Sequence, residues 1–358
     1  MRLVVSVIFL LSLLTTNLYA EIYRFPAGDG SVNKSGQQLV IYSTTDIEAA
    51  RPLIEDFQLL HQKIRVIYHD LQSLELFDRV LRETDAKKKT ADFAFSSAMD
   101  LQMKLANDGY ALRHESLAAR EIPSWANWRN EAFGVTFEPA VIVYNKRFFK
   151  GRKVPQTRAD LVDLLEKGGA DFFGKLATYD IQRSGLGFLI LARDLEHYSG
   201  TWNMVREMGR SSVKLFTSTA AILDRVSDGK FVLGYNVLGS YAATRAERDP
   251  SIGIILPTDF TVVLSRIALI PRNARSAENG KLFLDYLLSE RGQRVLAGKA
   301  GLNAIHPAVT GRRTATNMRK VAGSSLRPIK VGPGLLVYLD QFKRSKMLAN
   351  WENALTGR

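Results

Sequence analysis

The spacing of apolar and polar residues along the chain changes repeatedly between that of a strand and that of a helix. Residues 38–42 form a short, continuously apolar run, which is typical of a buried strand. Residues 46–62 then carry apolar side chains three and four positions apart, and so predict an amphipathic helix. Gly109 is placed to end the last helix of this first series. The later members of the series are strands at 64–68 and 91–95 and helices at 74–82 and 99–107.

Two longer extended stretches, 135–144 and 260–270, interrupt the series, and we expect them to cross between two lobes. Strands that alternate with helices indicate a mostly parallel sheet with helices on both faces. The predicted fold is therefore α/β with two lobes, each a mostly parallel sheet flanked by helices, joined by two extended crossings with a cleft between them. Lobe one comprises residues 37–136 and 265–358, including a C-terminal helical tail, and lobe two comprises residues 137–264.

The first twenty residues have the pattern of a secretory signal peptide rather than of folded structure. Arg2 is followed by an apolar run from Leu3 to Leu14, and Ala20 is a small residue placed just before Glu21. The run is shorter than the roughly 20 residues that a membrane-spanning helix needs. We therefore expect export to the periplasm, with cleavage near Ala20.

The charge balance favours an anionic partner. The chain carries 49 Lys and Arg residues against 36 Asp and Glu residues, a formal net charge of +13. Such an excess suits nucleic acid, a membrane surface or a small acidic ligand. Export and the lack of a nucleic-acid-binding motif disfavour nucleic acid. The chain has no cysteine, so burial of a core must stabilise it without disulfides. We expect a monomer that binds a small anionic ligand.

The candidate binding residues lie where a strand ends and a helix begins. Helix N-termini offer unpaired N–H groups and a partial positive charge, and ligands of open α/β sheets gather at the carboxyl ends of strands. Tyr235 and Asn236 end one such strand. Four further junctions, two in each lobe, are rich in hydroxyl groups. They are Ser43, Thr44 and Asp46; Ser96 and Ser97; Arg183, Ser184 and Gly185; and Thr217, Ser218 and Thr219.

Each junction also has a simpler interpretation, because Ser and Thr are favoured helix N-caps. Thr45 with Glu48 fits a capping box, and Ser97 with Asp100 resembles a cap. Four such junctions that face one cleft nevertheless favour an anion site. Hydroxyls, backbone N–H groups and an Arg are the groups that bind a phosphate.

Enzyme signatures are absent from the sequence. The five histidines lack metal-ligand spacing, and there is no HExxH motif and no cysteine ligand, so no metal site is expected. A GxSxG elbow, a P-loop and a dinucleotide fingerprint are also missing. We expect no catalytic residue and no cofactor. The enzyme alternative is a pair of carboxylates that are distant in sequence.

Six segments carry a family resemblance. They are 39–43 (LVIYS), 91–95 (ADFAF), 141–146 (VIVYNK), 184–187 (SGLG), 226–236 (VSDGKFVLGYN) and 277–296. Together they resemble the periplasmic solute-binding proteins of ABC importers, in the ferric-ion-binding-like branch. The resemblance implies a type II periplasmic-binding-protein fold whose lobes close over a ligand by a hinge movement, and a membrane ABC permease as partner.

The resemblance is nearer to organophosphate-binding members than to iron-binding ones. Iron-binding members place a His, a Glu and two adjacent tyrosines where this chain has Asp46, Ser97 and the pair Tyr235–Asn236. Ferric iron prefers anionic oxygen ligands, which hydroxyls and an Asn replace poorly. Members with Ser/Thr-rich junctions bind hexose phosphates, phosphoglycerate or phosphonates. The expected ligand is a phosphorylated organic compound. The alternatives are a ferric ion, or a sensing role for a membrane histidine kinase, as in some phosphoglycerate-associated relatives.

Overall fold

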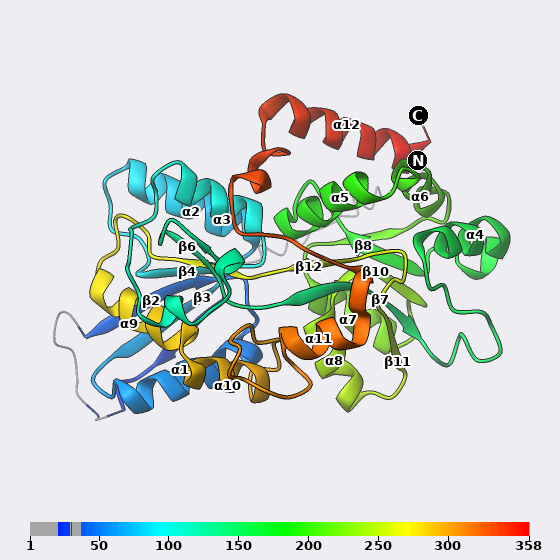
Figure 1. Cartoon of the computed structure of the whole chain (residues 1–358). Coiled ribbons are helices and arrows are strands. Elements are labelled where there is room, and N and C mark those ends of the chain that lie inside the picture. The colour runs from blue at the N-terminus through cyan, green and yellow to red at the C-terminus, as the bar shows by residue number, and fades with distance from the viewer. Residues whose placement is uncertain (1–20, 29, 31–36, 358) are drawn as a thin grey trace, which may run out of the picture.

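The protein folds into two α/β lobes that lie side by side (Figure 1). The structure is a computed structural model that describes residues 21–28, 30 and 37–357; the predicted signal peptide, residues 1–20, lies outside the described residues. Each lobe is built on a seven-stranded sheet. The predicted two-lobed fold is confirmed.

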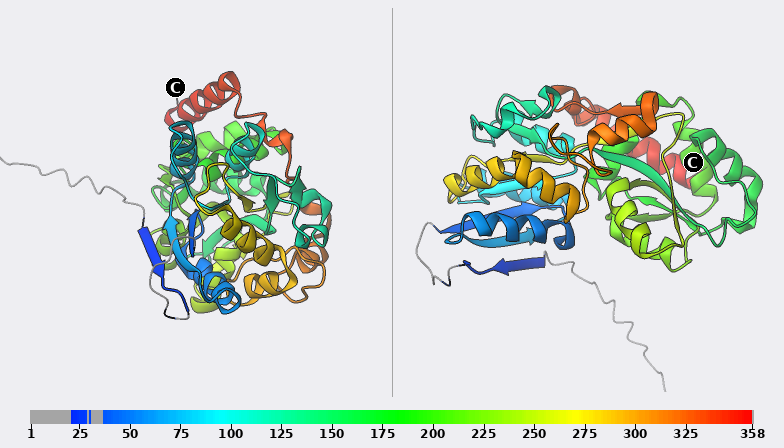
Figure 2. Two further views of the ribbon diagram at one scale, coloured as in Figure 1. Left: turned by 90° about the vertical axis from the view of Figure 1, so that its left-hand side faces the viewer. Right: turned by 60° about the horizontal axis from the view of Figure 1, so that its bottom comes forward.

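Lobe one contains both the first and some of the later parts of the chain. Its strands are β1 (Glu21–Phe25), β2 (Gln38–Ser43), β3 (Arg65–Asp70), β4 (Phe93–Ser96), β5 (Asn127–Trp128), β6 (Ala132–Gly134) and β13 (Ile267–Leu269). Its helices are α1 (Ile47–Leu60), α2 (Ser73–Asp85), α3 (Met99–Asn107), α9 (Ala277–Leu288), α10 (Glu290–Gly298) and α11 (Ala315–Ala322). The strand order is β1-β3-β2-β4-β13-β6-β5, with β1 at the outer edge (Figure 2).

Lobe two is formed mainly by the middle of the chain. Its strands are β7 (Glu138–Asn145), β8 (Leu176–Tyr179), β9 (Lys214–Phe216), β10 (Leu233–Leu238), β11 (Ile252–Ile255), β12 (Thr261–Leu264) and β14 (Leu326–Pro328). Its helices are α4 (Arg158–Gly168), α5 (Gly185–His197), α6 (Thr201–Arg210), α7 (Thr219–Ser227), α8 (Gly239–Arg248) and α12 (Gln341–Thr356). The strand order is β14-β12-β7-β10-β8-β9, and β11 pairs with β7.

Both sheets are mixed, whereas the sequence predicted mostly parallel ones. The strands that alternate with helices do pair in parallel: β2 with β3 and β4, and β8 with β9 and β10. The strands next to the lobe crossings, β7, β12 and β13, pair antiparallel with neighbours in their sheets. The reason is geometric, because a chain that passes to the other lobe and returns runs in the opposite direction.

The two predicted crossings join β6 to β7 and β12 to β13, and the chain passes between the lobes a third time between α11 and β14, which the sequence did not predict. The second is very short, since β12 ends at Leu264 in one sheet and β13 begins at Ile267 in the other. Both crossings lie within the stretches 135–144 and 260–270 that the sequence singled out.

The C-terminal segment differs from the expected assignment of residues 265–358 to lobe one. β14 pairs in parallel with β12 of lobe two, and α12 packs along α6, as the red helix above lobe two shows (Figure 1). The cause is an apolar face on α12, where Met347 and Trp351 are buried against residues of α5 and α6. Gly209 of α6 allows this close approach, since a Cβ there would lie 2.3 Å from the carbonyl oxygen of Leu355.

Local sequence features explain where several elements end. Gly109 follows α3 with φ +80, a left-handed conformation that costs glycine little, and its N–H donates to the carbonyl of Ala106. The prediction that Gly109 ends this helix is confirmed. Thr157 caps α4 through a capping box with Asp160. Among the described residues, no helix is both long and apolar enough to cross a membrane.

Candidate functional site

The four predicted junctions follow β2, β4, β8 and β9. Two of them meet in lobe one because β2 and β4 are parallel neighbours. The Thr44 hydroxyl donates to Ser96 Oγ at 3.3 Å, and the backbone N–H of Ser97 donates to Thr44 Oγ1 at 3.3 Å. Ser43 is buried, and its Oγ accepts from the N–H of Thr45 at 3.0 Å.

The caps expected in lobe one do not form. Helix α1 begins after Asp46, which makes no side-chain cap, and Thr45 Oγ1 instead accepts from Arg266 Nη1 at 2.9 Å. Helix α3 begins after Ala98 and not after Ser97. At the start of α1, a contact to the crossing segment therefore replaces the local cap. At the start of α3, the N–H of Ala98 donates to Ser96 Oγ at 3.2 Å.

The two junctions of lobe two do form caps. Ser184 Oγ accepts from the N–H of Gly187 at 3.1 Å, and Ser218 Oγ accepts from the N–H of Ala221 at 3.3 Å. Thr217 is partly exposed before the second cap, and Thr219 hydrogen-bonds through its hydroxyl to the Tyr179 hydroxyl. Arg183 is exposed and forms no ion pair within the described chain.

Gly185 is the first residue of α5, and it lies against lobe one. Its N–H donates to Ser73 Oγ, on the first residue of α2, at 2.9 Å. The lobes therefore touch at this junction.

Tyr235 and Asn236 are directed into lobe two. The Tyr235 hydroxyl and the Asn236 amide both donate to Asp194 Oδ2, at 2.9 and 2.8 Å, and Arg158 holds the other oxygen of that carboxylate. Asn236 has φ +62 at a bulge in β10, a left-handed conformation in which Asn is enriched. Both residues thus have a structural role, and neither lines the cavity between the lobes.

A cavity of about 560 Å³ opens between the lobes. This volume is in the range of small-molecule sites. Lobe one supplies the start of α1 and the loop after α10, and lobe two supplies α7 and α8. The lining residues are Asp46, Glu48, Ala49, Ala220, Leu223, Tyr241, Thr244, Arg245, Glu247, Arg248, Gly298, Lys299, Ala300, Gly301 and Arg313.

Cations outnumber acids on the cavity wall. Arg245 is paired with Asp224 at 2.6 Å and Arg313 with Glu247 at 2.8 Å. Arg248 and Lys299 are exposed and form no ion pair within the described chain. They are consequently available to an anion that enters the cavity.

Asp46 is one of the acidic residues that line this cavity. Burial raises the pKa of Asp46 to about 6, and the nearby Arg266 guanidinium opposes that rise. The N–H of Asp46 donates to the Tyr241 hydroxyl at 3.0 Å. This is a second contact between the lobes.

Behind the cavity, a buried ion pair joins the two crossings. Arg266 Nε donates to Glu138 Oε1 at 2.7 Å, and both side chains are 1% exposed. Ser240 and Thr136 donate to the same carboxylate, and Arg266 also reaches Thr45 of lobe one. The hinge region is therefore a closed network of charged and hydroxyl groups.

The sequence analysis did not predict this ion pair, although the sequence contains a feature that indicates it. Each extended crossing contains a single charged residue, and the two have opposite signs: Glu138 in the first and Arg266 in the second. Buried charges are almost always paired. Two lone charges of opposite sign in two adjacent crossings could have predicted the contact.

Among the described residues, no group of three or more His, Cys, Asp or Glu side chains is placed to hold a metal ion.

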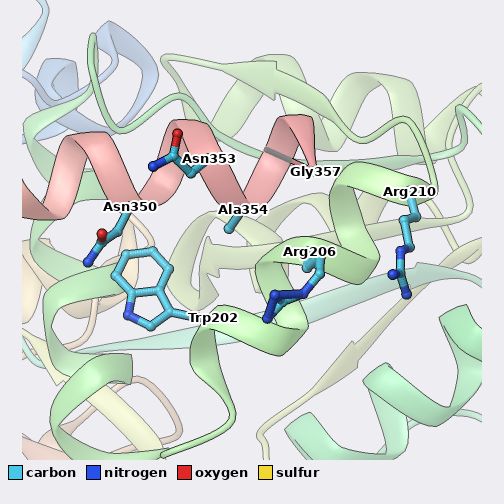
Figure 3. A pocket seen from close by; sticks show the side chains of 7 residues that line it. All are labelled: Trp202, Arg206, Arg210, Asn350, Asn353, Ala354 and Gly357. Atoms are coloured by element: carbon cyan, nitrogen blue, oxygen red, sulfur yellow. The ribbon is translucent and has the colours of Figure 1, made fainter.

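A second concavity, of about 440 Å³, lies away from the interlobe cavity, between α6 and α12. Trp202, Arg206 and Asn350 are among the residues that line it (Figure 3). None of the residues singled out from the sequence lines that groove.

The chain is similar to solute-binding proteins in sequence and in structure. Residues 90–324 match the family described as bacterial extracellular solute-binding protein. The crystal structure of the substrate binding protein of an ABC transporter from Agrobacterium tumefaciens is 50% identical, covers 94% of this chain and 99% of its own, and superposes with a TM-score of 0.91.

Two more distant relatives are known with a bound ligand or a transport role. The periplasmic binding protein AfuA from Actinobacillus pleuropneumoniae, solved with exogenous fructose-6-phosphate bound, is 17% identical over 89% of this chain and 98% of its own, with a TM-score of 0.76. The phosphoglycerate transport regulatory protein PgtC of Salmonella typhimurium is 24% identical over 75% of this chain. The match spans 66% of the length of that relative.

Proposed function

Because this chain belongs to the bacterial extracellular solute-binding proteins, we propose that it captures a phosphorylated organic compound between its lobes for a membrane ABC permease. The ligand class is a sugar phosphate, a phosphoglycerate or a phosphonate. The binding residues are those of the four junctions together with the basic wall of the interlobe cavity. The protein acts as a monomer, without a cofactor and without catalysis.

The observation that carries this proposal is the composition of the interlobe cavity. Arg248 and Lys299 offer uncommitted positive charge on its wall. Of the residues expected from the sequence, Asp46 lines the cavity, whereas Thr44 and Ser96 contact each other outside its lining. Charge-assisted hydrogen bonds of this kind are the strong ones for a phosphate. Asp46 lies on the lobe-one side of the cavity with Lys299, and it can accept hydrogen bonds from the hydroxyls of the organic part.

Two relatives support the phosphate class. AfuA was solved with fructose-6-phosphate, and PgtC is named for phosphoglycerate transport. The 50% identical relative from Agrobacterium tumefaciens is described as part of an ABC transporter, which supports the permease as partner. The ferric alternative is less well supported, because Asp46 and Ser97 bring no further His, Cys, Asp or Glu with them to form a metal-binding group in the described chain.

A sensing role is the second candidate, since PgtC is described as a regulatory protein. In that case the closed, ligand-bound form would be recognised by a membrane histidine kinase. Binding measured on the isolated chain is the same for both outputs. They are separated by measuring uptake of the ligand in cells that lack this protein.

The test is a calorimetric titration of residues 21–358, stripped of ligand by partial unfolding and refolding. The titrants are hexose phosphates, phosphoglycerates, phosphonates, inorganic phosphate, citrate and ferric citrate. Saturable binding of one organophosphate is expected. Arg248→Gln is expected to weaken it about 10-fold or more, the usual cost of a lost charge-assisted hydrogen bond. Arg120→Gln is the matched control, because Arg120 is exposed and lies outside the cavity.

Binding of ferric ion alone would overturn the phosphate proposal. An organophosphate that binds equally well to Arg248→Gln and to Arg183→Ala would overturn the assignment of the basic residues.

A further inference from the structure

At the starts of two helices, a hydroxyl group of one lobe accepts a hydrogen bond from a backbone N–H of the other lobe. In lobe one, Ser73 Oγ accepts from the N–H of Gly185, at the start of α5 in lobe two, at 2.9 Å. In lobe two, the Tyr241 hydroxyl accepts from the N–H of Asp46, at the start of α1 in lobe one, at 3.0 Å. The first N–H groups of a helix have no partner within the helix itself. In both places, a hydroxyl from the other lobe supplies that partner.

We propose that these contacts form a latch that holds the lobes together before ligand arrives, and that Gly185 is the residue that allows the latch to close. This proposal rests on the proposed function, because closure matters here as the step that retains the ligand. Its first measurement, however, needs no ligand.

Gly185 is required only by the contact between the lobes. A Cβ at this position would lie 2.6 Å from Leu101 Cδ1, 3.1 Å from Ser73 Oγ and 3.3 Å from Ala98 Cβ. All three atoms belong to lobe one, and no lobe-two atom is among these nearest neighbours. The backbone of Gly185 is that of the first turn of a helix, where Ala is better than Gly. Gly185→Ala is therefore compatible with each lobe by itself and incompatible with their closure.

Gly187, two residues further on, is required by packing within lobe two and not by the contact between the lobes. A Cβ there would lie 2.3 Å from Tyr179 Cβ, within lobe two. Gly187→Ala should consequently damage lobe two whether the lobes are open or closed. The two glycines give a matched pair of substitutions in one helix turn.

The hydrogen bond between Gly185 and Ser73 lies at the edge of an apolar seam. Met99 and Met103 of α3 pack in one cluster with Leu186 of α5, so side chains of both lobes form a common core. Ser73 is 7% exposed. A buried N–H that loses its acceptor keeps the full desolvation cost, so Ser73→Ala should open the latch even though it removes only one oxygen atom.

The test measures the distance between the lobes in the ligand-free protein. The chain has no cysteine, so spin labels at Lys88→Cys in lobe one and Lys167→Cys in lobe two are unambiguous. Both positions are exposed. Pulsed electron paramagnetic resonance is expected to show a major short distance for the parent chain. Gly185→Ala and Ser73→Ala are expected to shift the distribution to longer distances.

The controls separate a latch from a general loss of stability. Gly185→Ala should lower the midpoint of thermal unfolding less than Gly187→Ala does, because it leaves the packing within each lobe intact. Ser289 caps α10, because its Oγ accepts a hydrogen bond from the N–H of Gly292. Ser289→Ala removes this cap. It should lower the unfolding midpoint and leave the distance distribution unchanged.

Ligand affinity gives a second, quantitative check. Apparent affinity falls by the factor by which the binding-competent population falls. Ser73 is not among the proposed binding residues, so a 10-fold loss of the short-distance population in Ser73→Ala predicts a 10-fold weaker apparent affinity. A parent chain that is wholly open without ligand, or a Gly185→Ala chain that closes as the parent does, would overturn the latch. If the distances shift as expected but no organophosphate binds, the latch stands and the proposed function fails.

Discussion

Removing one partner of the buried Arg266–Glu138 ion pair is expected to destabilise the protein strongly. The two side chains are each 1% exposed, and Arg266 Nε lies 2.7 Å from Glu138 Oε1. Glu138→Gln keeps the shape of the side chain but leaves the guanidinium buried without its counter-charge. Breaking such a pair costs about 3–5 kcal/mol. That is a large part of a typical total stability of about 5–15 kcal/mol.

Urea unfolding followed by tryptophan fluorescence measures the loss. The exposed pair of Arg51 and Glu55 is the matched control, since its atoms are 3.8 Å apart and its side chains are 48% and 58% exposed. Glu55→Gln should cost less than about 1 kcal/mol. Arg266→Met combined with Glu138→Gln should cost less than the sum of the single changes, because no charge is then left buried alone. A Glu138→Gln loss as small as that of the control, or additive single changes, would refute this account of the hinge.

Three further outcomes are expected. Burial raises the pKa of Asp70 to about 7 and that of Asp46 to about 6, so the folded state holds protons that the unfolded chain releases near pH 4. Their contribution to stability therefore falls as the pH rises from about 4 to 7, and Asp70→Asn should flatten that part of a plot of unfolding midpoint against pH. Gly209→Ala should detach α12, seen as faster amide exchange in that helix, because its Cβ would lie 2.3 Å from the carbonyl oxygen of Leu355; unchanged exchange would contradict this. Thr157→Ala should lower the unfolding free energy by about 1 kcal/mol by removing the cap of α4, and a neutral result in urea unfolding would count against that cap.

The sequence predicted the elements better than the contacts between them. The helix expected at 46–62 is α1, and the crossing expected within 260–270 contains the passage from β12 to β13. Apolar spacing is a local property, so it locates such elements well. Which element covers which is decided by contacts far apart in the sequence, and the placement of α12 on lobe two depended on a glycine in α6 that no periodicity marks.

In the candidate site, too, local motifs were predictable from the sequence and contacts between distant segments were not. Ser184 and Ser218 are recognisable as caps because a cap is a local motif. Thr45 matched a local motif too, yet its hydroxyl accepts from Arg266, 221 positions away. A hydrogen bond to a buried guanidinium on the crossing segment replaces the local cap there. Tyr241 could not be predicted as a contact to Asp46, since that contact exists only when the two lobes meet.

The position of β13 in lobe one has a consequence for how the chain reaches its native state. β13 pairs with β4 on one side and with β6 on the other, so it completes the middle of the sheet. It comes from residues 267–269, long after β6 ends at residue 134. Until it arrives, β4 and β6 both present unpaired edges, and every residue of β4 is buried in the finished fold. Open apolar edges invite pairing between chains. A partly made or partly unfolded molecule is therefore exposed to aggregation for as long as this one short strand is missing.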